Sequence, residues 1–323
     1  MKVIVRERYG SPEVLELRDV EKPAVEDDSI LVRVRAASIN AYDLHMMRGS
    51  PSLVRLMAGL RKPKSSAMGV DVAGQVEAVG KSVTQFRVGD EVFGSRTGSL
   101  GEYVRCTDKS TLAPKPTGIS FEEAAAVPMA ATTALQGLRD KGRIGPGKRV
   151  LINGASGGVG TFAVQIAKAL GAHVTAVCST RNVEQARSLG ADDVIDYTKE
   201  DFTKRGRRYD VILDVAATGS LASRRRALEP DGTLVGVGSA NNDGTASIAA
   251  GLLQTAVMSR FGNQKIPFFL AKNSKDDLLF LKDLIEAGKV RPVIDRTYPL
   301  TEIADAMRYL ETGHARAKVV ITV

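Results

Sequence analysis

The sequence predicts an α/β protein in which a small all-β domain is combined with a doubly wound parallel sheet. Residues 1 to about 120 consist of short strand-like runs separated by Gly, Pro and Asp. Beyond Ser120, apolar strand-like runs alternate with segments of helical spacing, and strands joined by crossover helices form a parallel sheet. A glycine-dense turn at residues 154–160 follows the first of these later strands.

Three segments of the first domain have the pattern of strands. Residues 30–36 alternate apolar and basic side chains, which is typical of a half-buried strand. Residues 72–80 and 91–94 are the next expected strands, and Gly89 and Asp90 form the turn between them. The many glycine corners indicate an irregular β structure.

The alternating part begins at Ser120, because Ser120 and Glu123 fit a capping box at a helix start. The alanine-rich segment that follows is expected to be helical and interrupted at Pro128. The strands expected in the parallel sheet are 150–153, 173–178, 192–196, 209–214 and 233–237. The helices expected between the first pairs are about 158–170, 182–189 and 219–228.

The end of the chain contains two amphipathic helices, at 275–287 and 301–312, and a closing strand at 318–323. We expect this strand to return to the first domain. The first domain then comprises residues 1–121 and 265–323, with a nucleotide-binding domain of residues 122–264 inserted between them.

The composition is that of an ordinary soluble globular protein, with 43% hydrophobic and 25% charged residues. The formal net charge is 45 − 37 = +8, but the basic residues are scattered, so no nucleic-acid partner is expected. Cys106 and Cys178 provide neither a disulfide framework nor a set of zinc ligands. No apolar run is long enough to span a bilayer, and the chain starts with a strand-like segment rather than a signal peptide. A cytoplasmic location is therefore expected.

The glycine turn predicts a dinucleotide site. Glycines allow the backbone to approach a pyrophosphate, and the N-terminus of the following helix offers free N–H groups and a positive dipole end. Ala155 stands at the usual first glycine of the G-x-G-x-x-G pattern, whereas Gly157 and Gly160 keep the later two positions. A plain strand-to-helix turn is the alternative.

The turn after the second strand of the sheet favours NADPH over NADH. NAD-selective sites place an acid there to bind the ribose 2′-hydroxyl, but this chain has Ser179, Thr180 and Arg181. Hydroxyls and a guanidinium attract a 2′-phosphate and satisfy its oxygens. The alternative is that Arg181 only begins a solvated helix.

A set of segments spread along nearly the whole chain carries a family resemblance. They are residues 69–80, 86–94, 101–104, 122–128, 154–160, 189–192, 194–197 and 314–320. Together they resemble the medium-chain dehydrogenase/reductase superfamily, and specifically its zinc-independent, quinone-oxidoreductase-like branch. The resemblance implies a GroES-like β-barrel catalytic domain, a Rossmann cofactor domain and a substrate cleft between them.

The resemblance also implies a site without metal. Zinc-dependent members bind the metal through an early Cys and a Gly-His-Glu segment, but the positions that look equivalent here are Asn40 and Gly69-Val70-Asp71. The histidines, His45, His173 and His314, are spread along the chain rather than clustered as zinc ligands are. Without a Lewis acid, an activated C=C or a quinone is a better hydride acceptor than a plain alcohol.

The implied function is NADPH-dependent reduction of small-molecule quinones or α,β-unsaturated carbonyls. An enoyl-thioester reductase is the nearest enzymatic alternative. A non-catalytic NADPH-binding protein, such as a sensor or an RNA-associated factor, is the alternative from another class.

The resemblance assigns roles to individual residues. Asn40 and Asp43 match the Asn-x-x-Asp pair of the family beside the nicotinamide, although a turn-capping pair is the alternative. Tyr42 is a candidate proton donor and completes the expected catalytic set, and His45 is a second candidate donor. The expected cofactor-binding residues are Thr133, Ala155, Ser156, Gly157, Gly158, Val159, Ser179, Arg181, Tyr197, Gly238, Ser239, Phe268 and Phe269. Core packing explains one of the two phenylalanines equally well.

The last strand of the parallel sheet predicts a homodimer. An apolar edge strand such as 233–238 tends to be paired or covered. In relatives of this kind, two cofactor domains often join there about a two-fold axis. A covering loop from residues 241–262 is the alternative.

Overall fold

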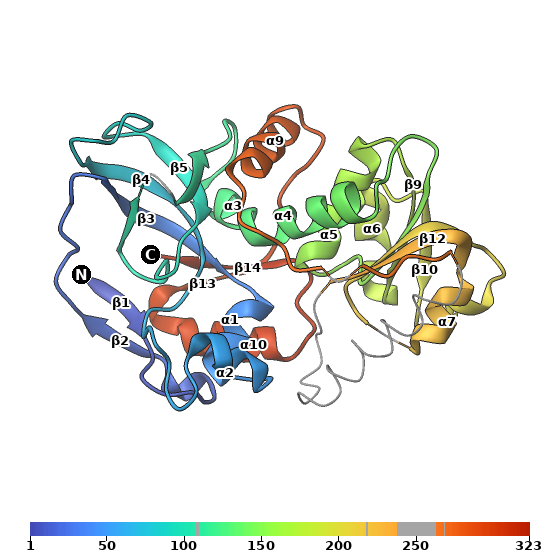
Figure 1. The fold of residues 1–323 in the computed structure, drawn as a ribbon, viewed down its shortest axis with the longest axis horizontal. Coiled ribbons are helices and arrows are strands. Elements are labelled where there is room, and N and C mark those ends of the chain that lie inside the picture. Colours follow the sequence, from blue (N-terminus) through green and yellow to red (C-terminus); the bar gives the residue numbers. More distant parts are fainter. Residues whose placement is uncertain (108–109, 218, 238–262, 268) are drawn as a thin grey trace. The chain divides into compact units, whose positions relative to one another are not determined.

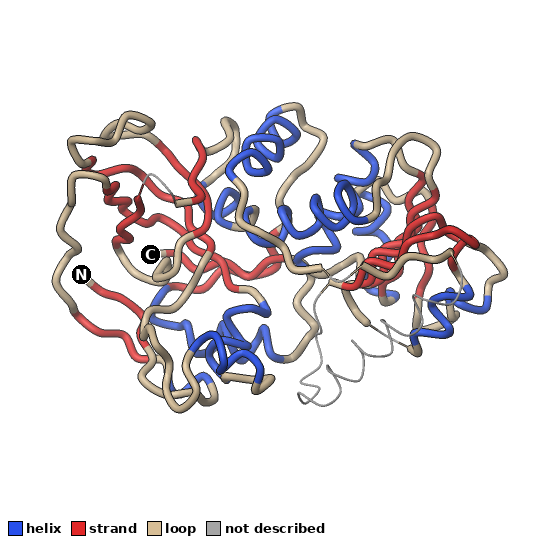
Figure 2. The backbone as a smooth tube through the Cα atoms, viewed as in Figure 1, coloured by secondary structure: helices blue, strands red, loops and turns tan. Residues whose placement is uncertain are grey.

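The computed structural model describes residues 1–107, 110–217, 219–237, 263–267 and 269–323 of the 323-residue chain. It divides into two compact units (Figures 1 and 2). Unit 1 contains Met1–Thr132, Asn273–Ala287 and Pro292–Val323, and unit 2 contains Thr133–Lys272 and Gly288–Arg291.

The division between the units falls after Thr132, whereas the sequence placed it after residue 121. The reason is packing. Helix α3 (Phe121–Ala125) contacts strands of unit 1, and its Ala124 and Ala125 are fully buried there. The capping box predicted for this helix is present: Ser120 Oγ accepts a hydrogen bond from Glu123 N at 3.2 Å, and Glu123 Oε2 accepts one from Ser120 N at 2.8 Å.

Unit 1 is built around a seven-stranded sheet, which is antiparallel except for one parallel pair at its β13–β14 end. Within the described residues the two end strands, β13 and β7, are not paired with each other, so the sheet is open. Strands β1 (Lys2–Val5) and β2 (Glu16–Asp19) form a separate antiparallel pair. The strand order is β13 (Ile294–Pro299), β14 (Lys318–Thr322), β3 (Ser29–Ile39), β4 (Asp71–Val79), β5 (Glu91–Ser95) and β7 (Thr111–Pro114), and β6 (Tyr103–Thr107) also pairs with β3.

Strand β3 contributes side chains to two hydrophobic cores. Ile30, Val32 and Val34 are buried in one core, whereas Ala37 and Ile39 are buried in the other. The register with β4 shifts between Val34 and Ala36, which indicates a β-bulge, and the polar Ser38 lies beyond this shift.

The helices of unit 1 surround the sheet. Helix α10 buries Ile303, Ala306 and Met307 in the same core as Ile39. The helices are α1 (Ala41–Arg48), α2 (Leu53–Ala58), α9 (Lys275–Glu286), α10 (Ile303–Glu311) and the start of α4 (Pro128–Gln136), which continues into unit 2. Single turns of 3-10 helix lie at Pro12–Val14, Thr180–Asn182, Phe202–Lys204 and Leu300–Glu302, and a π turn lies at Gly137–Lys141.

Unit 2 is the predicted parallel sheet with crossover helices. Its strand order is β10 (Asp193–Asp196), β9 (His173–Cys178), β8 (Arg149–Asn153), β11 (Tyr209–Asp214) and β12 (Leu228–Gly236). The crossover helices are α5 (Gly158–Ala169), α6 (Val183–Ser188) and α7 (Leu221–Arg226). These elements agree with the predicted strands and helices, except that β12 begins five residues earlier than expected.

The strand order reverses beside β8, which places the glycine turn at the switch point of the sheet. Because crossover connections are right-handed, α5 and α6 cover one face, and α7 covers the other (Figure 1). Ligands of such sheets bind beyond the carboxyl ends of the strands at the switch point. The fold thus positions the turn after Asn153 for ligand binding.

The outer edge of β12 is partly covered by the chain itself. Leu234 N donates to Lys265 O at 2.8 Å, and Lys265 N donates to Gly232 O at 2.9 Å. Lys265 follows residues 241–262, the segment that would cover this edge in the alternative to a homodimer. Residues 241–262, together with Gly238, Ser239 and Phe268, lie outside the described residues.

Candidate functional site

The glycine turn after β8 is held tightly against the start of α5. Gly154 has a positive φ of 86°, which L side chains rarely adopt. A Cβ on Gly160 would lie 2.1 Å from Gly154 O, so the helix can begin this close to the turn only with glycine at that position. Ala155 is fully buried, and its N–H donates to Val177 O at 3.0 Å. Ala155 therefore shapes the turn, and its N–H is not free for a ligand.

Gly157 leaves space above the turn. A Cβ placed there would meet only Gly154 O, at an ordinary 3.6 Å. The N–H groups of Gly158, Val159 and Gly160 open α5, and within the described residues no hydrogen bond occupies them. Open space and free donors at a helix N-terminus fit the diphosphate of a dinucleotide. Gly157, Gly158 and Val159 would hold that group, with the half-buried Ser156 beside them.

The ends of β9 and β10 bring the predicted 2′-phosphate residues together. Tyr197 N donates to Cys178 O at 3.0 Å, which places Tyr197 next to Ser179. Ser179 is half-buried and accepts a hydrogen bond from Asn182 Nδ2 at 3.1 Å. Arg181 is exposed, as is Tyr197. A hydroxyl, a phenol and a guanidinium thus lie at or just beyond the ends of neighbouring strands.

An acid that was not predicted from the sequence lies at this place. Asp196, the last residue of β10, accepts hydrogen bonds from Thr180 Oγ1 at 2.6 Å and from Thr198 Oγ1 at 2.7 Å. The Thr180 hydroxyl holds the pKa of Asp196 below its usual range. The turn after β9 contains no acid, but the neighbouring strand supplies one. The signal was the parallel pairing of the two predicted strands, whose carboxyl ends lie side by side.

A second unpredicted carboxylate secures the switch point. Asp214 ends β11, is 1% exposed, and accepts hydrogen bonds from Asn153 Nδ2 at 2.8 Å and Ala217 N at 2.9 Å. Its other oxygen pairs with the guanidinium of Arg224. These contacts join the ends of β8 and β11 directly below the glycine turn.

Unit 1 contains a buried polar cluster formed by Ser38, Asn40, Asp71 and Lys318, which we call the Asp71 cluster. Asp71 is fully buried, and its Oδ2 accepts hydrogen bonds from Ser38 Oγ and Asn40 Nδ2, each at 2.9 Å. Asp71 Oδ1 accepts one from Met129 N at 3.0 Å. Lys318 Nζ lies 3.5 Å from Asp71 Oδ2 and also donates to Asn40 Oδ1.

The register of three strands assembles the Asp71 cluster. Ser38 of β3 lies opposite both Asp71 of β4 and Val320 of β14. Lys318 is 2% exposed, and burial lowers its pKa. Removing one partner of a buried ion pair costs about 3–5 kcal/mol, so the cluster stabilises the arrangement of these strands. The amide of Asn40 is held at both ends by the ion pair.

Asp43 caps the start of α1 together with Asn40, as the turn-capping interpretation of this pair predicts. It is 1% exposed, and its Oδ2 accepts a hydrogen bond from Asn40 N at 2.8 Å at the start of α1. Burial raises the pKa of Asp43 to about 7. Tyr42 is 44% exposed, and burial of its phenol together with the Asp43 charge raises its pKa. The Tyr42 phenol is therefore protonated at neutral pH.

The remaining predicted residues have separate surroundings. His45 Nδ1 lies 2.9 Å from Ser50 O. Thr133 is 9% exposed on α4. Phe269 is 7% exposed and lies close to Gly137, so it packs in the core of unit 2. Core packing was the alternative role for one of the two phenylalanines.

The positions that look equivalent to zinc ligands pair with the ammonium group of Lys318. Asn40 and Asp71 bond to each other and to Lys318 Nζ. Across the described residues, no group of three or more His, Cys, Asp or Glu side chains is arranged to hold a metal ion. None of the helices among these residues is long and apolar enough to cross a membrane.

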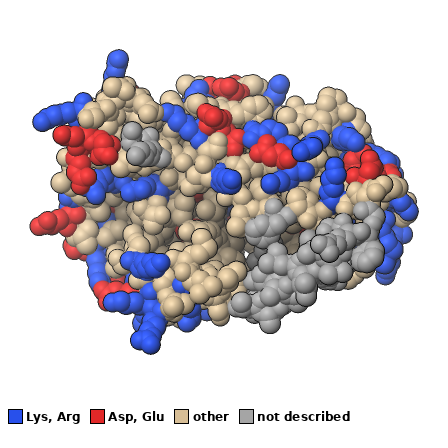
Figure 3. Space-filling model, viewed as in Figure 1, with Lys and Arg blue, Asp and Glu red and all other residues tan. Residues whose placement is uncertain are grey.

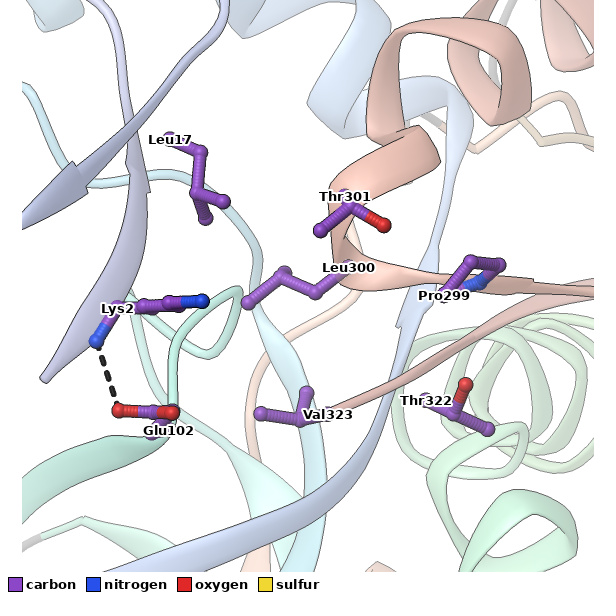
Figure 4. Close-up of a pocket in the computed structure, with 8 residues that line it drawn as sticks. All are labelled: Lys2, Leu17, Glu102, Pro299, Leu300, Thr301, Thr322 and Val323. Atoms are coloured by element: carbon purple, nitrogen blue, oxygen red, sulfur yellow. Dashed lines mark hydrogen bonds between the residues drawn. The ribbon is translucent and has the colours of Figure 1, made fainter.

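A pocket of about 290 Å³ in unit 1 lies apart from these residues (Figure 4). Its walls come from β1, β2, the residue before β6, and the ends of β13 and β14. Lys2 N donates to Glu102 Oε2 at 2.7 Å at its rim. None of its lining residues belongs to the predicted site, and its walls are largely apolar. The lining residues are Lys2, Leu17, Glu102, Pro299, Leu300, Thr301, Thr322 and Val323.

The surface charges are interspersed rather than gathered. Figure 3 shows Lys and Arg side chains across the visible face with Asp and Glu among them. For example, Lys168 Nζ forms an ion pair with Asp192 Oδ1 at 2.7 Å. On this face the basic side chains are thus spread among acidic ones, in keeping with the scattered basic residues of the sequence.

Two family models match the chain. The one described as the alcohol dehydrogenase GroES-like domain matches residues 26–136, and the one described as zinc-binding dehydrogenase matches residues 189–321. An open β unit and a parallel sheet with a dinucleotide turn define an oxidoreductase that uses a nicotinamide cofactor. The prediction of a GroES-like domain joined to a Rossmann sheet is confirmed.

Similar proteins define the branch. The NAD(P)H oxidoreductase RTN4IP1, mitochondrial, of Bos taurus is 36% identical over 100% of this chain and 89% of its own. The NADPH-dependent alkenal/one oxidoreductase, chloroplastic, of Arabidopsis thaliana is 34% identical over 99% and 79%. The structure of Escherichia coli quinone oxidoreductase complexed with NADPH has a TM-score of 0.84 and 25% identity, covering 100% of both chains. The chain belongs to the medium-chain dehydrogenase/reductase superfamily, in its quinone-oxidoreductase-like branch.

Two glycine substitutions should separate ligand binding from folding. Gly157→Ala adds a methyl group with ordinary contacts, so the protein should keep its melting temperature within about 2 °C while losing at least tenfold in NADPH affinity. Gly160→Ala forces a methyl group against Gly154 O and should lower the melting temperature strongly. Fluorescence titration with NADPH and thermal unfolding measure the two effects. Unchanged NADPH affinity in Gly157→Ala would contradict the assigned cradle.

The buried Asp43 should make stability depend on pH. Its pKa is about 7 in the folded state and 3.8 in the unfolded state, so between these values the folded protein holds a proton that the unfolded chain releases. Its contribution is therefore fully favourable below pH 4 and is lost as the pH rises to 7. Relative to Asp43→Asn, the wild type should lose about 3 kcal/mol of unfolding free energy between pH 5 and pH 8. Urea unfolding of both proteins measures this, and a constant difference would refute it.

Proposed function

We propose that this protein is an NADPH-dependent reductase that transfers hydride to quinones or α,β-unsaturated carbonyls without a metal ion. The observation that carries the proposal is the glycine turn, whose open space over Gly157 and free N–H groups suit a dinucleotide diphosphate. The names of the Arabidopsis thaliana and Escherichia coli relatives, an NADPH-dependent alkenal/one oxidoreductase and a quinone oxidoreductase complexed with NADPH, support both the cofactor and the acceptor class.

The Asp71 cluster supports an acceptor that needs no Lewis acid. The side chains of Asn40 and Asp71 are hydrogen-bonded to each other and contact Lys318. These are the positions at which zinc-dependent members would bind the metal, and here their polar groups are already paired. An enone or a quinone delocalises the arriving negative charge into its own carbonyl, whereas an alcohol requires its hydroxyl to be polarised.

Some residues of the chain would bind the cofactor or the substrate, and Tyr42 would supply a proton. Bound NADPH would provide the hydride, as nicotinamide cofactors do. Gly157, Gly158 and Val159 would hold the diphosphate. Asn40, fixed by the ion pair, keeps one amide N–H beyond the one given to Asp71 and can donate it to a carbonyl oxygen. Tyr42 holds a phenolic proton at neutral pH, and Asp43 keeps the backbone of Asn40 in place.

A substrate panel with chelation tests this function. NADPH oxidation is followed with quinones, enals, enones and crotonyl thioesters, before and after exhaustive treatment with EDTA. We expect turnover with quinones or enones that survives chelation. Turnover of the thioester alone would favour an enoyl-thioester reductase, and tight NADPH binding with no turnover would favour the non-catalytic alternative. Stoichiometric zinc whose removal abolishes turnover would refute the metal-free site.

Arg181 should set the preference for NADPH. It supplies positive charge beside Ser179 and Tyr197, whereas Asp196 lies close by and opposes a 2′-phosphate. Arg181→Ala should weaken NADPH binding by about tenfold to a hundredfold, because a charge-assisted hydrogen bond is lost, and should leave NADH binding nearly unchanged. Titration of both cofactors measures this, with Lys199→Ala as the control at the neighbouring exposed cation. Equal affinity of the wild type for the two cofactors would overturn the preference.

We also propose a homodimer through the β12 edge. Among the described residues, Lys265 pairs with this edge at Gly232 and Leu234, and a second copy would pair with the strand beyond that point. Light scattering at micromolar concentration should give a mass near twice the 34.5 kDa of one chain. A mass of one chain would show that the covering segment is sufficient.

A further inference from the structure

A buried arginine beside the candidate site has hydrogen-bond donors without an acceptor among the described residues. Arg6 follows β1, is 2% exposed, and its backbone N donates to Ser66 O at 2.9 Å. In the described part of the chain, its Nε and Nη1 have no hydrogen-bond partner. Its guanidinium carbon lies 5.3 Å from the centroid of the Tyr9 ring. Buried donors without partners cost free energy, so they point to a group that the protein does not itself provide.

A second arginine contacts the same ring. The guanidinium carbon of Arg55, on α2, lies 4.9 Å from the Tyr9 centroid, and its Nε donates to Gly49 O at 2.9 Å. Tyr9 is fixed in turn because its hydroxyl donates to Gly59 O at 2.7 Å. No carboxylate among the described residues forms an ion pair with either arginine.

The surroundings of Arg6 do not neutralise it. The titratable groups that act on it are Tyr9, Tyr42 and Asp43, and desolvation lowers its pKa. An arginine stays charged even so. Asp43 makes no hydrogen bond or ion pair with Arg6 and accepts one from the backbone of Asn40 instead. The result is a pair of cations on one aromatic ring, close to the candidate proton donor Tyr42.

We propose that Arg6 and Arg55 form a binding position for an anionic oxygen group of the substrate, a carboxylate or a phosphate. Guanidinium groups bind both through charge-assisted hydrogen bonds. This proposal rests on the proposed function, because the substrate would be an enone or quinone that also carries an acidic group. Its location beside Tyr42 would set the reacting carbonyl near the proton donor.

Binding of unreactive anions tests this position independently of turnover. Levulinate, a saturated keto acid, and inorganic phosphate are titrated calorimetrically at constant ionic strength, with neutral 2-pentanone as the uncharged control. We expect saturable binding of at least one anion, weakened about tenfold to a hundredfold in Arg6→Met and less in Arg55→Met. Arg8→Met, which removes an exposed arginine two residues away, should bind like the wild type. The tighter anion identifies the preferred acidic group.

Turnover tests the same position as a determinant of substrate choice. With NADPH, kcat/KM is compared for trans-4-oxo-2-pentenoate and the matched neutral enone 3-penten-2-one. The wild type should prefer the acid at least tenfold, Arg6→Met should lose this preference mainly through KM, and Arg6→Lys should recover part of it. If no enone is reduced, the proposed function fails, while anion binding still decides whether Arg6 is a binding residue.

Two outcomes would overturn the proposal. One is equal anion affinity in the wild type and Arg6→Met, and the other is a loss of NADPH affinity without a loss of anion affinity. Thermal unfolding adds a separate criterion, because replacing an unpaired buried charge with an apolar side chain of similar size is often neutral or stabilising. We therefore expect the melting temperature of Arg6→Met to equal or exceed that of the wild type. Arg55→Met, at a half-buried position, provides the binding measurement if Arg6→Met does not fold.

Discussion

The buried ion pair between Asp71 and Lys318 is the interaction on which the architecture of unit 1 depends. It joins two strands that are nearly 250 residues apart in the chain, and Asp71 also accepts the backbone N–H of Met129, where α4 begins. A buried charge that loses its partner is costly, so β14 must return to its place beside β3. The chain can therefore build the whole of unit 2 between these segments without separating them.

Unit 2 uses buried carboxylates in a related way at the carboxyl ends of its strands. Asp214 connects β8 to β11, and Asp196 gathers the hydroxyls of Thr180 and Thr198. In both cases side chains and backbone N–H groups outside the glycine turn satisfy the acid. The N–H groups of Gly158 and Val159 therefore remain available, which is the property that a diphosphate site requires.

The sequence predicted the strands and helices of unit 2 because each has a clear hydrophobic period, and the glycine turn marks the start of α5. Helices α1 and α2 were not predicted, since α1 buries only Asp43 and Met47 and α2 only Ala58. The contacts of Asp71 could not be predicted either, because they join β3, β4 and β14, which are far apart in the chain, and depend on the register in which these strands pair.

Two cations in unit 1 show that burial alone does not define a role. Lys318 and Arg6 are each 2% exposed, but the Nζ of Lys318 faces Ile39 O, Asn40 Oδ1 and Asp71 Oδ2, whereas the Nε and Nη1 of Arg6 face no acceptor among the described residues. The free energy of a buried charge depends on the partners that replace water. A fully partnered cation stabilises the fold, and its removal should be costly. An unpartnered cation destabilises the folded chain by itself, and this cost is offset only when an anionic group binds beside it.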